Sequence, residues 1–330
     1  MLLKKYSIFC YIKGGKQVEY IKLKNSSLNV SRLCMGGCPL GEYGWGKVDE
    51  RELIRAVETA VFQGVNFFDT ADTYGLGTSE TLLGKVFRGN RQNVIIQDKF
   101  GVRAEPGERT VYDNSRKYII NACDASLKRL NTDYIDIYVI HYRDGKTPLG
   151  DVVETLEYLK KCGKIRCFGL SNIHKDDESE ISEYKDKFVT FQDEYSLACR
   201  KNEKEMFKFR DDFGLTPLTW GSLGQGILSG KYNENNVNFG SDDRRSRDIY
   251  VNFHGEKLKQ NLRIVEVLRQ IAADRNKPVS AVAVRFILDY IKESAVLVGI
   301  KTPQQLEQNV KALDWQLEKE EIESLLSVSS

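Results

Sequence analysis

Short apolar runs recur along the chain, and segments with helical spacing separate them. After residues 30–35, for example, Asp49 and Glu52 begin a segment in which apolar residues return every three to four positions until Gly64. This spacing predicts an amphipathic helix with a capping box at its start and a glycine at its end. Eight runs predict strands: residues 30–35, 65–68, 94–98, 135–140, 165–170, 188–191, 215–219 and 295–298.

The alternation of strands and helices predicts the fold class. Strands that are apolar on both faces and are joined by helical crossovers form parallel sheets covered by helices. Eight such units favour a closed (β/α)8 TIM barrel over an open doubly wound sheet. The first strand also lacks the G-x-G-x-x-G that opens dinucleotide-binding sheets. We further expect an N-terminal β-hairpin (residues 20–23 and 28–30), two helices before the last strand and an extra C-terminal helix.

The length of the chain fits one such barrel. Barrels of alternating strands and helices commonly reach this size as single domains, so we predict one domain over residues 18–330 of the 330. Residues 1–17 form an N-terminal extension that we expect to be disordered or variable. Its apolar run, residues 6–12, is too short to span a bilayer, and no small-residue cleavage site follows it.

Charge and cysteine content limit the classes of binding partner that the sequence predicts. Lysine and arginine total 49 against 47 acids, and the resulting net charge of +2 is not gathered in blocks, so the sequence predicts neither nucleic-acid nor membrane binding. The seven cysteines lack paired C-x-x-C spacing, which favours reduced thiols in the cytoplasm. We therefore expect a small-molecule partner.

Several strand ends carry groups that can hold or move a proton. Asp69 and Tyr74 follow the second strand, Lys99 the third and His141 the fourth. Each alone has another explanation, as a turn cap, a loop contact, a snorkelling lysine or a core histidine. In a barrel, however, these strand ends meet at one face, where active sites lie. The three histidines of the chain lack metal-ligand spacing, so we predict no metal site.

The four residue types form a plausible acid site. A tyrosine loses its proton near pH 10, so we expect a neighbouring cation, Lys99, to lower the pKa of Tyr74 toward neutrality. Asp69 would hold the lysine ionised. His141 would orient a carbonyl group and stabilise a developing alkoxide.

The chain resembles the aldo-keto reductases from about residue 20 to residue 326. The segments that carry the resemblance are FFDTADTYG, IIQDKFG, YVIHYRD, GKIRCFGLSN, FQDEYSL, GSLGQGILSGKY and VLVGIKTPQQLEQNVKAL. The family's catalytic tetrad falls on Asp69, Tyr74, Lys99 and His141. The resemblance implies an oxidoreductase in which NADPH (NADP+ when oxidised) lies across the barrel mouth and gives hydride to an aldehyde or ketone, producing an alcohol.

The resemblance also implies cofactor contacts. Ser171, Asn172 and Gln192 would hold the nicotinamide carboxamide, and Trp220 would stack on the ring. The remaining expected contacts are Gly36 and Gly37, the pyrophosphate loop with Gly221, Ser222, Leu223 and Gln225, the 2′-phosphate pair Lys301 and Thr302, and the adenine neighbours Gln305, Gln308 and Asn309. Lys301 and Thr302 have an alternative role, which is to open the next helix with Thr302 as its cap.

Some positions depart from the family pattern. Trp220 stands where a tyrosine is usual, Gly221 and Ser222 replace a Ser-Pro pair, and Gln305 replaces an arginine found in many members. An indole can still stack on a ring. Asp193 also stands in place of the usual asparagine beside Gln192.

Candidate substrate residues are Tyr43, Trp45, Tyr142 and Arg143. Aromatic and arginine side chains suggest a polar carbonyl compound, either sugar-like or acidic, whereas arginines in the segment 232–253 could equally lie on a solvated lid. A second function also stays open, a cofactor-binding regulatory subunit resembling potassium-channel β subunits. The complete tetrad and the lack of a long arm before the barrel favour the enzyme. The sequence predicts neither the physiological substrate nor the oligomeric state.

Overall fold

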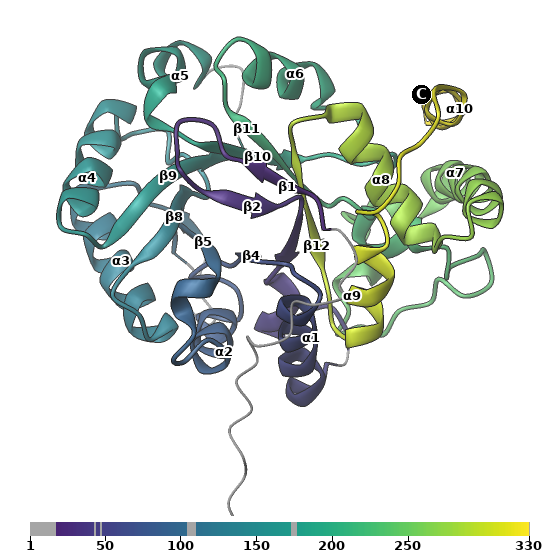
Figure 1. Ribbon diagram of the computed structural model, residues 1–330, viewed down its shortest axis with the longest axis horizontal. Coiled ribbons are helices and arrows are strands. Elements are labelled where there is room, and N and C mark those ends of the chain that lie inside the picture. The colour runs from purple at the N-terminus through teal and green to yellow at the C-terminus, as the bar shows by residue number, and fades with distance from the viewer. Residues whose placement is uncertain (1–17, 43, 47, 104–109, 173–176, 330) are drawn as a thin grey trace, which may run out of the picture.

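Eight parallel strands close into a barrel surrounded by helices in the computed structural model (Figure 1), which describes residues 18–329 except 43, 47, 104–109 and 173–176. The predicted (β/α)8 fold is therefore confirmed. The predicted extension, residues 1–17, lies outside the described residues, so the domain division stays a prediction. The barrel strands are β3 (Leu33–Gly36), β4 (Phe67–Asp69), β5 (Ile95–Phe100), β8 (Ile135–Ile140), β9 (Ile165–Ser171), β10 (Thr190–Glu194), β11 (Thr216–Trp220) and β12 (Ala295–Gly299).

The helices alternate with these strands as the apolar spacing predicts. They are α1 (Glu50–Phe62), α2 (Thr78–Val86), α3 (Arg116–Leu130), α4 (Leu149–Lys161), α5 (Glu178–Tyr184), α6 (Glu203–Asp211), α7 (Gly255–Asp274), α8 (Val279–Ile291), α9 (Pro303–Val310) and α10 (Lys319–Val328). Two of them, α7 and α8, precede the last strand, and α10 is the extra C-terminal helix. Short 3-10 helices are η1 (Cys38–Gly41), η2 (Arg91–Asn93), η4 (Lys185–Lys187), η5 (Gly224–Ser229), η6 (Arg244–Ser246) and η7 (Val251–Phe253).

Local side-chain bonds fix the helix starts. The Asp49 carboxylate accepts from the backbone N–H of Arg51 at 2.8 Å, and the Ser115 hydroxyl accepts from that of Tyr118 at 3.4 Å. Each bond satisfies an N–H that the first helical turn leaves without a partner. The apolar positions of α1 are buried against the barrel, which explains why the amphipathic pattern was sufficient to locate this helix.

An antiparallel hairpin, β1 (Tyr20–Lys22) and β2 (Asn29–Ser31), lies across the amino-terminal end of the barrel (Figure 1). Leu23 and Val30 from this hairpin pack with Phe67 and Ile137 in the barrel interior. The Lys24 N–H also donates to Thr216, the first residue of β11. The hairpin thus closes one end, and the carboxyl ends of the strands are left to form a site.

Several strand boundaries differ from the sequence prediction by one to three residues. The first barrel strand begins at Leu33 rather than at residue 30, because residues 30 and 31 pair with β1 instead. The predicted loop after the third strand contains a second hairpin, β6 (Val102–Arg103) and β7 (Val111–Tyr112). Its two-residue strands are too short to show an alternating pattern.

Candidate active site

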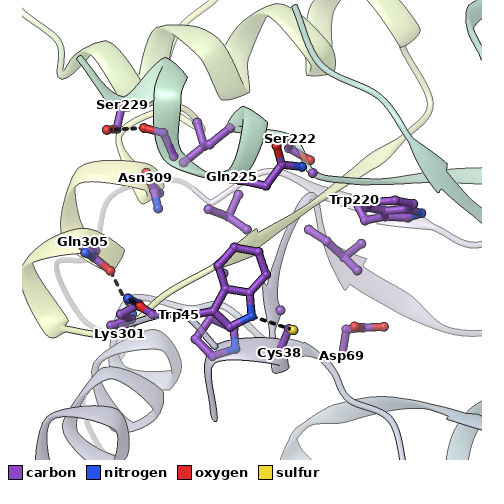
Figure 2. Close-up of a pocket in the computed structure, with 18 of the residues that line it drawn as sticks. Cys38, Trp45, Asp69, Trp220, Ser222, Gln225, Ser229, Lys301, Gln305 and Asn309 are labelled. Carbon is purple, nitrogen blue, oxygen red and sulfur yellow. Dashed lines mark hydrogen bonds between the residues drawn. The ribbon is translucent and has the colours of Figure 1, made fainter. Parts of the chain in front are cut away.

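A cavity of about 690 Å³ lies at the carboxyl ends of the barrel strands. Asp69 ends β4, Ser171 ends β9, Trp220 ends β11, and all three line the cavity. Figure 2 shows Asp69 and Trp220 on one side of this pocket and Lys301, Gln305 and Asn309 on the other. The pocket therefore has two chemically different ends.

A buried ion pair lies under the Asp69 end. The Lys99 ammonium donates to both carboxylate oxygens of Asp69 at 2.6 Å and to the carbonyl oxygen of Thr70 at 2.9 Å. Both side chains are almost completely buried, at 1% and 2% exposed. Such a pair stays ionised only if each charge has close partners, and here these bonds provide them. Lys99 is not itself part of the pocket lining.

Two amides complete the surroundings of the Asp69 carboxylate. The side-chain nitrogen of Gln192 donates to Oδ2 at 2.7 Å, and that of Gln97 donates to the same oxygen at 2.9 Å. Gln192 lines the pocket, whereas Gln97 does not. The interior of the barrel thus contains a hydrogen-bonded cluster in which Asp69 and Gln192 reach the pocket and Lys99 and Gln97 lie behind them.

Tyr74 lines the pocket above the ion pair. The Lys99 Nζ atom lies 4.9 Å from the centre of its ring, and the His141 ring lies edge-on at 6.0 Å. Burial, followed by the charge of Asp69, raises the pKa of Tyr74 well above its ordinary value. The expectation that Lys99 lowers this pKa is therefore not met, because burial and the carboxylate outweigh the cation. Tyr74 keeps its proton at neutral pH, as a proton donor must.

His141 lines the pocket as a neutral imidazole. Burial, with Lys99 as the second cause, lowers the pKa of His141 well below its ordinary value. The Nδ1 atom is buried without a hydrogen-bond partner, and the backbone carbonyl accepts from Asn172 Nδ2 at 2.9 Å. The Tyr142 ring stacks on the imidazole at 5.0 Å. A neutral ring can form a hydrogen bond to a carbonyl group without placing a second cation beside Lys99.

Most of the predicted cofactor residues line this pocket. They are Gly36, Ser171, Asn172, Gln192, Trp220, Gly221, Ser222, Leu223, Gln225, Lys301, Gln305, Gln308 and Asn309.

Gly37 and Thr302 lie outside the lining. A Cβ on Gly37 would lie 2.4 Å from the carbonyl oxygen of Asp69, so this glycine permits strand packing rather than ligand approach. The Thr302 hydroxyl accepts from the Gln305 N–H at 3.3 Å and caps α9, which was the alternative role considered for it.

Only some of the predicted substrate residues line the pocket. Trp45 and Tyr142 line the pocket, and Tyr43 lies outside the described residues. The prediction for Arg143 needs correction: its guanidinium donates to Glu180 at 2.8 Å and to the Thr147 carbonyl oxygen at 3.1 Å, and it does not line the pocket. Adjacent positions in a loop point in different directions, so the sequence could not separate Arg143 from Tyr142.

The sequence prediction missed several lining residues. Cys38 accepts from the Trp45 indole N–H at 3.1 Å (Figure 2), and Tyr250 meets the Trp45 ring edge-on at 6.1 Å. Lys231, Arg244 and Arg245 add positive charge to the lining. Arg244 and Arg245 belong to the segment 232–253, whose arginines the sequence left open between the substrate site and a solvated lid, whereas Lys231 precedes that segment.

Comparison with known proteins identifies the family. The model of the aldo/keto reductase family matches residues 32–330. This chain belongs to that family. It is therefore an NAD(P)H-dependent oxidoreductase acting on carbonyl groups. It is 33% identical over 307 residues to the aldo-keto reductase YhdN of Bacillus subtilis, covering 92% of this chain and 91% of that protein.

Solved structures agree with this fold. The glycerol dehydrogenase AKR11B4 of Gluconobacter oxydans superposes with a TM-score of 0.84 at 28% identity, covering 94% of each chain. An aldo-keto reductase of Klebsiella pneumoniae in complex with NADPH gives 0.72 at 22% identity over 95% of each chain. A probable potassium-channel β subunit of Arabidopsis thaliana is 29% identical over 90% of this chain and 92% of its own, but such relatives do not outweigh the enzymes.

Within the described ranges, no group of three or more histidine, cysteine or acidic side chains is placed to hold a metal ion. Among the same residues, no helix is long and apolar enough to cross a membrane.

Proposed function

We propose that this enzyme reduces a small polar aldehyde or ketone to an alcohol with NADPH, and that Tyr74 supplies the proton. The observation that supports this most directly is the placement of Tyr74 and His141 in one pocket wall, directly above the buried Asp69–Lys99 pair. The four side chains come from the ends of three strands and the loop after β4. Their meeting at one face of the barrel supports a shared catalytic role over separate roles in capping and core filling.

The far end of the pocket fits an anionic cofactor. Lys231, Arg245 and Lys301 line it, and Gly221, Gly224 and Gly226 have positive φ angles of 65°, 54° and 106° that bend the intervening loop around the cavity. A Cβ on Gly226 would lie 3.7 Å from the Tyr232 ring and 3.9 Å from Arg245 Nη1, so the loop passes close to this cation. These cations and the glycine loop would hold the phosphates, and NADPH would supply the hydride.

The side chains then have distinct tasks. Tyr74 transfers its hydroxyl proton to the carbonyl oxygen, and Lys99 stabilises the phenolate that remains. His141, held neutral, forms a hydrogen bond that orients the carbonyl group. Trp45, Tyr142 and Tyr250 provide aromatic walls, and Arg244 favours a substrate with polar substituents. The six described cysteines are free thiols, which supports a cytoplasmic location.

Replacing Tyr74 by phenylalanine tests the acid. Tyr74→Phe removes one hydroxyl and preserves the ring that packs beside His141, so we expect kcat to fall by roughly a hundredfold or more with little change in NADPH affinity. NADPH oxidation with a panel of aldehydes, ketones and sugar carbonyls measures the rate, and quenching of NADPH fluorescence measures binding. Near-normal turnover by the variant would show that another group donates the proton.

Replacing Lys301 by alanine tests the phosphate end. Lys301 lines the pocket and donates to the Trp45 carbonyl oxygen. Losing a hydrogen bond to a charged phosphate costs about 1.5–3 kcal/mol, so Kd for NADPH should rise roughly ten- to a hundredfold while Kd for NADH hardly changes. An equal loss for both cofactors would place the 2′-phosphate elsewhere. Lys319→Ala, which removes an exposed lysine on α10, is the control.

The same lysine predicts a pH dependence. Burial, with the charge of Arg245 as the second cause, lowers the pKa of Lys301 to about 8. The ammonium is therefore present below pH 8 and is lost as the pH rises through that value. We expect the preference for NADPH over NADH to decline between about pH 7 and pH 9 in the wild type and to stay flat in Lys301→Ala.

The regulatory alternative makes a different prediction. A subunit that only senses its cofactor would bind NADPH tightly but turn over none of the panel. Wild-type turnover that Tyr74→Phe abolishes would exclude it.

A further inference from the structure

Gln97 is a buried polar residue with no assigned task in the reaction. It lies on β5, is 0% exposed, and pairs in register with Asp69 on β4. It is absent from the pocket lining, so it touches neither cofactor nor substrate. Its nearest polar neighbours are the Asp69 carboxylate at 2.9 Å and the Thr190 hydroxyl at 3.4 Å.

The chemistry of these neighbours fixes the direction of the Gln97 amide. The carboxylate of Asp69 can only accept, so the amide nitrogen faces it. The amide oxygen faces Thr190, whose hydroxyl can donate. A flipped amide would place its oxygen against the carboxylate and its nitrogen away from the charge. Gln97 is thus a donor aimed at a single oxygen atom, Asp69 Oδ2.

That oxygen holds the ion pair in position. Oδ2 accepts from Lys99, Gln97 and Gln192, whereas Oδ1 accepts from Lys99. Without Gln97 the carboxylate would lose one of its buried hydrogen-bond donors. Rotation of the carboxylate would move the Lys99 ammonium, which lies 4.9 Å from the Tyr74 ring centre.

We propose that Gln97 is a positioning residue for carbonyl reduction: its amide fixes the Asp69 carboxylate, which fixes the Lys99 ammonium beneath Tyr74. This inference rests on the proposed role of Tyr74 as the acid. Other ionisable groups lie near the pair: Cys34 on β3, Cys38 in η1 and Asp98 on β5. Burial raises the pKa of each group above its ordinary value, which leaves the two thiols uncharged. His141 is neutral for the same reason.

Two substitutions test the proposal. Gln97→Met removes the donor at similar volume, and we expect kcat to fall roughly ten- to a hundredfold with Kd for NADPH within about twofold, because the acid is misplaced and the cofactor is not. Gln97→Glu keeps the shape and donates to Asp69 only while the new carboxyl is protonated. Burial and the adjacent carboxylate favour the protonated form, and Lys99 opposes it.

The pH profile separates positioning from packing. Relative to wild type, kcat of Gln97→Glu should be highest at low pH and fall as the pH rises and the new carboxyl ionises, whereas the Gln97→Met deficit should not vary with pH. Kinetics between pH 5 and pH 9 measure both ratios. A Gln97→Met enzyme within twofold of wild type, or a Gln97→Glu deficit that is constant with pH, would overturn the proposal. If Gln97→Met does not fold, the isosteric Gln97→Glu variant decides alone.

Controls distinguish this inference from the function on which it rests. Thr190→Val removes the hydroxyl on the other side of Gln97 and leaves the donor to Asp69 in place, so its pH profile should match wild type. Gln316→Glu adds the same charge at an exposed site and should change nothing. Tyr74→Phe is measured alongside: if it stays active, the proposed acid is wrong, and if it is inactive while Gln97→Met is normal, only the positioning role is wrong.

Discussion

Asp72, two residues before Tyr74, titrates near neutral pH. Burial, with the charge of Glu80 as the second cause, raises its pKa from an ordinary 3.8 to about 7. Its Oδ2 atom accepts from the Tyr118 hydroxyl at 3.2 Å, whereas Oδ1 is buried without a partner. The backbone N–H of Asp72 donates to the carbonyl oxygen of Lys99 at 3.2 Å. This carboxyl group therefore lies inside the loop that carries the acid, with a charge that depends on pH.

The pKa of Asp72 predicts how stability changes with pH. Above pH 3.8 the unfolded chain releases this proton while the folded chain keeps it, so the free energy of unfolding falls as the pH rises to about 7. Asp72→Asn keeps an acceptor for Tyr118 and removes the titration. We expect the variant to match wild type near pH 4.5 and to exceed it at pH 8 by at least roughly 1 kcal/mol, or about 2 °C in Tm. Calorimetry at both values checks this, and an equal difference at the two pH values would contradict it.

Residue types at strand ends were predictable because a barrel brings those ends together. This holds for Asp69, Lys99 and His141, which are the last residue of β4, the last but one of β5 and the residue after β8. Positions farther into loops were less predictable, because a loop can turn either way: Tyr74 and Trp45 line the pocket as expected, whereas Arg143 does not. Arg143 turns to Glu180, and the pocket receives Arg244 from a segment a hundred residues later. The raised pKa of Tyr74 also depends on burial, which a sequence does not quantify.

The close contact of α2 with α3 depends on Gly84. A Cβ at this position would lie 2.6 Å from the backbone of Arg129 and Leu130 at the end of α3. The loop that carries Tyr74 leads directly into α2, so this contact also supports the active-site loop. Glycine permits the helices to approach at a distance that any side chain would prevent.

Gly84→Ala should therefore destabilise the protein although alanine is the better helix former. Alanine gains about 1 kcal/mol of helix propensity, but displacing backbone costs about 1–3 kcal/mol, and we expect a net loss in Tm. Gly150→Ala in α4 is the matched control, because its added Cβ meets only the end of the Tyr184 side chain, which can move, and no backbone. A Gly84→Ala protein at least as stable as Gly150→Ala would show that α2 and α3 can separate without cost.

Elements with caps and long apolar faces were predictable, and short elements were not. Asp49 and Ser115 located α1 and α3 because each provides a side-chain acceptor beside a periodic segment. The hairpin β6–β7 has neither a cap nor a long pattern. The order of two helices before β12 followed from the apolar spacing alone, since each helix has a continuous buried face.

At the scale of the whole molecule, a buried arginine joins the two ends of the barrel chain. Arg285 on α8 is 0% exposed and donates to Glu19 at 2.7 Å and to Asp289 at 2.5 Å. Glu19 also accepts from Arg32 at 2.9 Å, just before β3. The start of the described chain is thereby fixed to α8, the helix that precedes the last barrel strand.

Arg285→Leu should be among the most destabilising single changes in this protein. It would leave Glu19 and Asp289 without their shared cation in a largely buried site, which typically costs about 3–5 kcal/mol. Urea unfolding followed by circular dichroism measures the loss. Arg275→Leu, which removes a more exposed pair with Glu321, should cost far less. Similar losses for the two variants would mean that the buried network is no more important than a surface pair.

The hairpin at the amino-terminal end determines the route by which cofactor and substrate enter the active site. Because Leu23 and Val30 fill that end, a molecule that reaches Asp69 must enter from the carboxyl end, and the cofactor and the carbonyl compound share this approach. Because they share this approach, the two molecules must bind in a fixed order, with the cofactor first. A carbonyl compound that arrives first occupies the path the cofactor needs, so an excess of it should slow turnover by forming a dead-end complex, and raising the cofactor concentration should relieve the inhibition.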